Sequence, residues 1–259
     1  MIENSFAKEI YQKYIIKRIQ NKENRTLIIG IDGPTASGKT ILADNLKAEI
    51  ESSGKKCFIY RLDWTLISRE DRLKDLAIIN KTKASLAYEG ALHMRLSMVE
   101  NFLKEIRETE FLKQKKNIKL KKLYSRENDG KINGTSLVKF DIDHVIILEG
   151  HYTCESRIAR YIDINLMLLG DCNELINRKK NRVKNYRASN EVEDYFNRID
   201  LPSFKNHLKN FTFASDIIVD NTDYRRPKIK DQEFLLSWIN LNKSQINKKI
   251  KKAKLTKII

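Results

Sequence analysis

Apolar and polar residues alternate along this chain in patterns that predict strands followed by helices. Short apolar runs have the length and composition of buried strands, and they cover residues 26–31, 55–62, 144–148, 164–169 and 216–219. Between and after them, apolar residues recur every three or four positions, as on one face of a helix, at residues 41–50, 69–81, 92–108, 195–208 and 231–242. This alternation predicts an α/β fold with a doubly wound, mostly parallel sheet and helices on both faces.

Four further segments complete the expected single domain of residues 1–259. Residues 1–20 carry an apolar stripe, so we expect an amphipathic helix that packs on the sheet; contact with a membrane surface or a partner is the alternative. Residues 114–140 hold strand-like runs separated by Asn-Asp-Gly and Asn-Gly, which predict a hairpin. We interpret the hairpin as a flap over a ligand pocket, with a plain surface hairpin as the alternative. Residues 174–190 form an arginine-bearing helix, and residues 243–259 form a basic tail.

A phosphate-binding motif lies between the first strand and its helix. Its sequence is Gly33-Pro34-Thr35-Ala36-Ser37-Gly38-Lys39-Thr40, the spacing of a P-loop. The glycines let backbone N–H groups turn towards an anion, and the helix dipole favours negative charge there. Lys39, expected to be an exposed loop lysine, would neutralise the outer phosphates, and the hydroxyl of Thr40 would bind Mg²⁺. We therefore predict a nucleoside triphosphate site formed by Gly33, Ala36, Ser37, Gly38, Lys39, Thr40 and Ile41.

Carboxylates follow two other predicted strands at the same edge of the sheet. Asp63 follows the second strand and Glu149 follows the run at 144–148. Ligands of doubly wound sheets bind outside the carboxyl ends of the strands. We expect Asp63 to orient an acceptor hydroxyl and accept its proton, with a helix cap as the alternative, and Glu149 to help Thr40 hold Mg²⁺. Candidate acceptor contacts are Trp64, Tyr88, Glu89, Tyr124, His151 and Tyr152.

Two arginines lie four residues apart in the predicted helix 174–190. Arg178 and Arg182 share one face, whereas the apolar residues of that helix lie towards another. The arginines could form a solvated face. Beside a triphosphate, we interpret them as part of a mobile lid that stabilises the transferring phosphoryl group. Arg187, further along the lid, is expected to contact the nucleotide.

The overall charge of +16 invites a comparison with nucleic-acid-binding proteins. The lysines are scattered, however, and no RNP, zinc-finger or KH signature accompanies them, so we do not expect a nucleic acid as partner. The cysteines show no metal-ligand spacing, and no apolar stretch is long enough to span a membrane. We expect a cytoplasmic chain without membrane contact, and homo-oligomer formation is left open.

Other P-loop classes can be tested by their own motifs. A GTPase needs Asn-Lys-x-Asp to bind guanine, and the nearest match, Asn80-Lys81-Thr82-Lys83, lacks the carboxylate. The Ser-Gly-Gly signature of an ABC-type ATPase does not occur. Small-molecule kinases remain.

The order of motifs across residues 26–220 resembles the uridine kinase and phosphoribulokinase family. The P-loop is followed by Asp63, the hairpin, Leu148-Glu149-Gly150, the lid arginines and Phe213-Ala214-Ser215-Asp216-Ile217-Ile218. The resemblance implies a kinase that uses ATP and Mg²⁺. In that resemblance, Asp63 matches the catalytic aspartate and Glu149 the Leu-Glu-Gly carboxylate. The positions matching lid arginines are Arg178, Arg182 and Arg187, and Pro202 to Phe204 resemble the family's Lys-Pro-x-Phe segment.

The segments that bind the nucleoside in uridine kinases match poorly. Thr65 follows Trp64 where that family has an aromatic residue, and its Asp-His-Pro-Asp motif appears only as Glu89-Gly90-Ala91-Leu92. Its Tyr-Asp-aromatic hairpin motif is reduced to Tyr124-Ser125-Arg126-Glu127. We therefore expect a hydroxyl of a nucleoside or a sugar-like metabolite as acceptor. A strict uridine or cytidine kinase, and a nucleic-acid-associated NTPase, are the alternatives.

Overall fold

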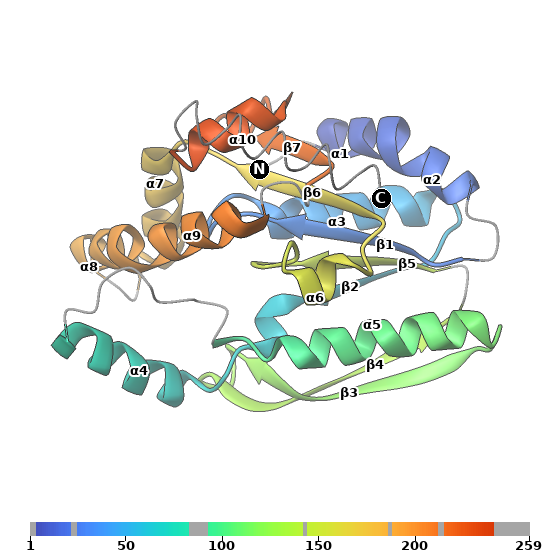
Figure 1. Ribbon diagram of the computed structural model, residues 1–259, viewed down its shortest axis with the longest axis horizontal. Helices are drawn as coiled ribbons and strands as arrows, with labels where there is room; N and C mark the ends of the chain where they lie inside the picture. The colour runs from blue at the N-terminus through green and yellow to red at the C-terminus, as the bar shows by residue number, and fades with distance from the viewer. Residues whose placement is uncertain are drawn as a thin grey trace.

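A mostly parallel β-sheet forms the centre of the fold (Figure 1). The computed structural model describes residues 4–21, 25–82, 93–141, 144–185, 188–211 and 215–240. Its strands in the central sheet are β1 (Leu27–Asp32), β2 (Cys57–Arg61), β5 (Val145–Glu149), β6 (Ile164–Leu169), β7 (Ile217–Asp220) and β8 (Lys228–Lys230). Within the described residues their order is β2-β5-β1-β6-β7-β8, and only β8 runs antiparallel to its neighbour. The predicted α/β fold with a mostly parallel sheet is confirmed.

Helices cover both faces of this sheet (Figure 1). Those of the first half are α1 (Asn4–Ile10), the π-helical turn η1 (Tyr11–Ile15), α2 (Ile16–Gln20), α3 (Lys39–Ser52), the 3₁₀ turn η2 (Leu62–Thr65), α4 (Arg69–Thr82) and α5 (Leu96–Phe111). Those of the second half are α6 (Ser156–Ala159), α7 (Cys172–Val183), α8 (Ser189–Tyr195), the π-helical turn η4 (Phe196–Asp200), α9 (Leu201–Phe211) and α10 (Gln232–Trp238). None of the helices in the described residues is both long and apolar enough to span a membrane.

Alternate residues of the central strands point to opposite faces, as the two-residue period of a strand requires. In β1, Leu27, Ile29 and Ile31 pack against α1 and α3, whereas Ile28 packs on the side of α5. Helices α9 and α10 cover that second face over β6 and β7. Because both faces are covered, all six residues of β1 are buried.

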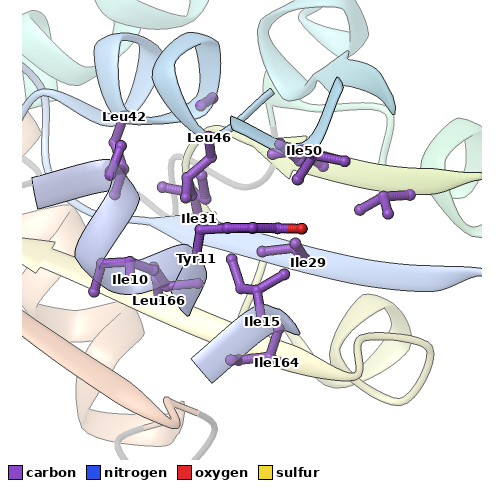
Figure 2. Packing of buried hydrophobic residues seen from close by; sticks show 14 of the residues in the cluster. Ile10, Tyr11, Ile15, Ile29, Ile31, Leu42, Leu46, Ile50, Ile164 and Leu166 are labelled. Carbon is purple, nitrogen blue, oxygen red and sulfur yellow. The ribbon is translucent and has the colours of Figure 1, made fainter. Parts of the chain in front are cut away.

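The N-terminal helical segment packs on the sheet beside β1, as the apolar stripe predicted. Ile10, Tyr11 and Ile15 are buried, and Figure 2 shows them between β1, β6 and the apolar side of α3. Helix α1, the π-helical turn η1 and helix α2 follow one another without a break. Because η1 has a wider turn, the apolar residues do not follow one regular helical period along the whole segment.

The predicted hairpin is formed by β3 (Lys116–Ser125) and β4 (Lys131–Phe140), which pair antiparallel outside the central sheet. Its buried face, which includes Ile118, Leu123 and Phe140, packs against the apolar face of α5. The pairing register shifts between Leu120 and Leu123, where the hairpin carries a bulge. The turn of the hairpin extends beyond the start of α5 towards the end of β2, where Arg126 contacts Asp63 (Figure 1).

A helix predicted for residues 195–208 begins earlier and is less regular. Helix α8 starts at Ser189, and the wider turn η4 joins it to α9. Pro202 lies just after η4 and cannot donate a backbone hydrogen bond to the preceding turn. A wider π turn at this point accommodates the proline without ending the helix.

Candidate active site

The candidate site is a cleft of about 930 Å³ at the carboxyl edge of the sheet. The P-loop follows β1, Asp63 follows β2 and Glu149 ends β5, so the strand order brings these groups together. The cleft is lined by Ala36, Gly38, Lys39, Thr40, Ile41, Arg61, Asp63, Trp64, Leu123, Tyr124, Ser125, Arg126, Glu127, Gly134, Thr135, Ser136, Glu149, Arg178, Arg182, Asn221 and Tyr224.

The P-loop has the backbone conformation that its glycines predicted. Gly38, directly before α3, has φ 97°, and Ala36 has φ 62°. At Gly33 a Cβ atom would lie 2.3 Å from the carbonyl oxygen of Leu168, so no side chain fits there. Gly33 and Ser37 are not among the described residues that line the cleft. The Ser37 hydroxyl is buried and has no hydrogen-bond partner within the described part of the chain.

Lys39 is buried, so the expectation of an exposed loop lysine is wrong. Its ammonium group lies inside the loop and donates to the carbonyl oxygen of Pro34 at 2.8 Å. Burial lowers the pKa of Lys39, while Glu149 and Asp32 nearby favour its charged form. The lysine thus lies inside the turn of the loop, where the predicted phosphate would bind.

Glu149 and Thr40 lie side by side at the base of the cleft. The Thr40 hydroxyl donates to Glu149 Oε1 at 3.1 Å, and Arg61 contacts Glu149 Oε2 at 3.4 Å and Asp44 at 2.8 Å. Burial raises the pKa of Glu149, and Lys39 opposes that shift. A hydroxyl and a carboxylate are the oxygen donors that suit Mg²⁺, which binds proteins through few side chains and completes its shell with phosphate and water. The residues present fit such an ion.

Asp32, which the motif analysis did not single out, joins the P-loop to the segment after β5. Its buried carboxylate accepts the backbone N–H groups of Gly33 at 2.8 Å, Tyr152 at 3.1 Å and Cys154 at 3.0 Å. A buried charge is stable only when hydrogen-bonded in this way. The signal in the sequence was an aspartate ending an otherwise apolar strand.

Gly150 brings Asp63 close to Glu149. A Cβ atom on Gly150 would lie 2.5 Å from Cβ of Leu62, so only glycine lets the ends of β2 and β5 approach this closely. Asp63 follows Leu62 in η2 and faces the cleft, where its carboxylate pairs with Arg126 of the hairpin turn. Arg126 could not be found from local sequence because it meets Asp63 only through the docking of the hairpin.

The predicted acceptor contacts divide into three groups. Trp64 and Tyr124 line the cleft; the tyrosine hydroxyl accepts from Arg72 at 2.6 Å, and the Trp64 ring lies 5.6 Å from that of Tyr60. His151 and Tyr152 do not line the cleft as it is formed by the described residues. Their rings pack against Phe204 and His207 respectively, and burial lowers the pKa of His151 well below its usual range. Tyr88 and Glu89 lie outside the described residues.

The arginines of the predicted lid occupy different positions. Arg182 lies over the P-loop, with its guanidinium 3.4 Å from the Thr35 hydroxyl. Arg178 donates to the carbonyl of Thr222 at 2.6 Å and stacks over the ring of Tyr224, 5.5 Å from its centroid. Both arginines line the cleft. Arg187 lies outside the described residues.

The loop after β7 forms part of the site that sequence analysis missed. Asn221 is buried, and its Nδ2 donates to the carbonyl of Ser37 at 2.8 Å. Tyr224, three residues later, lines the cleft beside Arg178. The loop therefore supports the P-loop from the side of β7, and no motif in the sequence marked it.

The chain matches the sequence profile of the Phosphoribulokinase / Uridine kinase family over residues 28–226. No curated protein sequence is significantly similar to it. The match covers the P-loop, Asp63, the hairpin, Glu149, the lid and the loop after β7.

Several solved structures share the fold at low sequence identity. A putative fructose transport system kinase from Silicibacter sp. TM1040 has 13% identity and a TM-score of 0.57, over 80% of this chain and 94% of that one. D-glycerate 3-kinase from Cryptococcus neoformans var. grubii has 14% identity and a TM-score of 0.57, over 87% of this chain and 98% of that one. Phosphoribulokinase from Rhodobacter spheroides has 17% identity and a TM-score of 0.51, over 76% of this chain and 71% of that one.

Proposed function

Because the chain belongs to the phosphoribulokinase and uridine kinase family, we propose that it transfers the γ-phosphoryl group of ATP to a hydroxyl of a nucleoside or a sugar-like metabolite. The observation that carries the proposal is that Asp63 and the P-loop residues Lys39 and Thr40 line one cleft. A kinase needs a phosphate cradle and a carboxylate for the acceptor hydroxyl on facing sides of one space.

The donor half of the cleft is built for a metal-bound triphosphate. P-loop kinases of this family use ATP with Mg²⁺. Backbone N–H groups of the loop and the start of α3 would bind phosphate oxygens, and Lys39 would neutralise their charge. Thr40 and Glu149 would hold Mg²⁺, which supplies charge neutralisation at the transferring phosphoryl group.

The acceptor half offers hydroxyl groups and an aromatic face. Ser125, Thr135 and Ser136 of the hairpin line the cleft together with Trp64. Hydroxyl groups of protein pair with those of a polyol, and an indole ring packs against the apolar face of a sugar or base. Asp63 would accept the proton of the attacking hydroxyl during transfer.

A screen of acceptors tests this function. Wild-type protein with ATP and Mg²⁺ is incubated with nucleosides, pentoses, sugar acids and their phosphates, and both ADP release and the phosphorylated acceptor are measured. We expect acceptor-dependent ADP release with at least one compound class. Uridine or cytidine as the sole acceptors would identify a strict pyrimidine nucleoside kinase. ADP release that no acceptor stimulates would contradict the proposal.

Replacing Glu149 with glutamine tests the proposed metal site. We expect Glu149→Gln to raise the Mg²⁺ concentration needed for half-maximal turnover by about 10-fold or more, because a neutral amide is a much weaker ligand for a hard cation. Turnover is measured against Mg²⁺ at fixed ATP. Asp44→Asn, which loses the other partner of Arg61, serves as the control. An unchanged Mg²⁺ dependence in Glu149→Gln would exclude its role at the metal.

The two lid arginines are expected to differ when each is replaced by alanine. Arg182 lies over the P-loop, so Arg182→Ala should lower kcat by about 10²-fold, with a smaller change in the KM for ATP. Arg178 is bound to the loop after β7, so Arg178→Ala should mainly raise the KM for ATP. Steady-state kinetics at saturating acceptor measure both. Lys180→Ala, which removes an ion pair with Glu193 away from the cleft, is the control.

A further inference from the structure

Arg95, directly before α5, contacts two separate walls of the acceptor half of the cleft. Its Nη2 lies 2.7 Å from the carbonyl oxygen of Lys122 in the hairpin. The same nitrogen lies 3.3 Å from the carbonyl oxygens of Trp64 and Leu66, and Nε donates to that of Thr65 at 3.2 Å. One side chain thus bonds both the segment that carries Asp63 and the strand that leads to the hairpin turn.

The hairpin presents the Lys122 carbonyl to Arg95 through its bulge. The register of β3 and β4 shifts between Leu120 and Leu123, and Lys122 has φ 55°, in the left-handed region. A bulged residue leaves the regular ladder, so its carbonyl can turn away from the partner strand. A non-glycine residue holds such a conformation only where surrounding contacts stabilise it, and the bond to Arg95 is one of them.

Without the guanidinium, backbone hydrogen bonds of the described residues still hold residues 65–67 and the turn of the hairpin, but they do not hold the bulge at Lys122. The N–H of Arg95 donates to Thr65 at 2.8 Å, and the N–H of Ile67 donates to His93 at 2.9 Å, so residues 65–67 stay beside 93–95 in any variant of Arg95. The N–H of Arg69 donates to the carbonyl oxygen of Gly130 at 3.1 Å and holds the hairpin turn, whereas the link to Lys122 depends on the side chain of Arg95. Its loss should change the spacing between the hairpin and Asp63 while the fold persists.

We propose that Arg95 is a positioning residue that sets the distance between Asp63 and the hairpin wall, and so places the acceptor hydroxyl for transfer. This inference rests on the proposed kinase function. Arg126 and Asp63 approach each other from these same two walls, which the Arg95 contacts hold in register. Phosphoryl transfer depends on such placement, and an error of about 1 Å can lower the rate by roughly 10²-fold.

Arg107, within α5, supplies a control for Arg95, which directly precedes that helix. Its guanidinium donates to the carbonyls of Thr26 at 3.1 Å and Tyr161 at 2.8 Å, which precede β1 and β6 at the opposite edge of the sheet. Both arginines donate to backbone carbonyls of two separate segments; Arg107 also pairs with Glu110 at 2.9 Å and Asp163 at 3.3 Å, and only Arg95 lies at the edge that carries the cleft. Arg95→Met, Arg95→Lys and Arg107→Met are compared with wild type.

We expect Arg95→Met to lower kcat/KM for the acceptor by about 10²-fold while the KM for ATP changes by less than about twofold. Arg95→Lys should recover part of the loss, because its ammonium can bond one wall but does not span both. Arg107→Met should melt at a lower temperature yet keep its acceptor kcat/KM per folded molecule. Equal losses of acceptor kcat/KM in Arg95→Met and Arg107→Met would overturn the proposal.

Amide hydrogen exchange provides a readout that does not need an acceptor. In Arg95→Met, amides of residues 119–125 should exchange about tenfold faster or more than in wild type and in Arg107→Met. Unchanged exchange there would overturn the positioning role even if wild type is an active kinase. If Arg95→Met exchanges faster but the wild-type protein phosphorylates no acceptor, the result would count against the proposed function alone.

Discussion

Lys39→Met is expected to lower turnover by roughly 10³-fold, the scale on which loss of one preorganised charged or hydrogen-bonding group acts on a transition state. The ammonium of Lys39 lies inside the P-loop cradle and donates to Pro34 at 2.8 Å. With triphosphate bound, the same group would neutralise negative charge that grows on the leaving oxygens. ADP release with saturating ATP and acceptor measures the effect.

The stability of this variant should remain close to wild type. Lys39 is buried, and burial lowers its pKa, so the folded state already opposes its charge. Methionine keeps most of the aliphatic length and removes that unfavourable term together with one hydrogen bond. Lys47→Met, on the exposed side of α3, is the matched control and should retain full activity. Full turnover by Lys39→Met would refute the assignment of the P-loop as the phosphate site.

Asp63→Asn is expected to lower kcat by roughly 10²-fold or more, the usual scale of general base catalysis. The substitution keeps the size of the side chain and removes its ability to accept a proton. Asp63 is the second residue of η2 and lines the cleft from outside the P-loop, so ATP affinity should be preserved. Single-turnover phosphoryl transfer and nucleotide binding are measured on the same preparation.

Two controls separate the loss of the base from the loss of the ion pair with Arg126. Arg126→Gln breaks the same pair but leaves the carboxylate, so its kcat should fall much less than that of Asp63→Asn. Asp129→Asn breaks the neighbouring pair between the hairpin turn and Arg69, at 3.1 Å, outside the cleft lining. If Asp63→Asn turned over normally and melted at a lower temperature, Asp63 would be a structural group.

Hydrophobic periodicity predicted most of the elements because burial on both faces of a parallel sheet leaves a clear local pattern. The run at 164–169 coincides with β6, and the runs at 144–148 and 216–219 lie within one residue of β5 and β7. Strand β8 was missed because Lys-Ile-Lys is short and polar at an edge of the sheet. Its pairing with β7 stabilises it, and nothing local marks it.

The P-loop side of the site was largely predictable because the P-loop is one contiguous segment. Its backbone turns depend on Gly33 and Gly38, which the sequence displays directly. The burial of Lys39 was not predictable, because it depends on how the loop closes around its ammonium group. Asp32 was overlooked although it lies in the same segment, since its three backbone partners come from a distant loop as well as its own.

The proposed acceptor half of the site depended on contacts between distant segments. Asp63 and Tyr124 could be nominated from their places after a strand and in a hairpin, but the pairing of Asp63 with Arg126 requires the docked hairpin. The same docking places Arg95 between two walls. His151, nominated for lying near Glu149, packs against Phe204, because β5 ends at Glu149 and the chain turns at Gly150, so His151 no longer follows the alternation of the strand.

Local sequence was thus sufficient for the α/β class, the P-loop and the carboxylates at the strand ends, because each follows from a pattern within about a dozen residues. The folded chain alone established which groups share the cleft. The strand order β2-β5-β1 places Asp63 beside Glu149 and the P-loop. Docking of the bulged hairpin places Arg126 beside Asp63. Those neighbours are set by packing between segments as far as 109 residues apart, which no local pattern encodes.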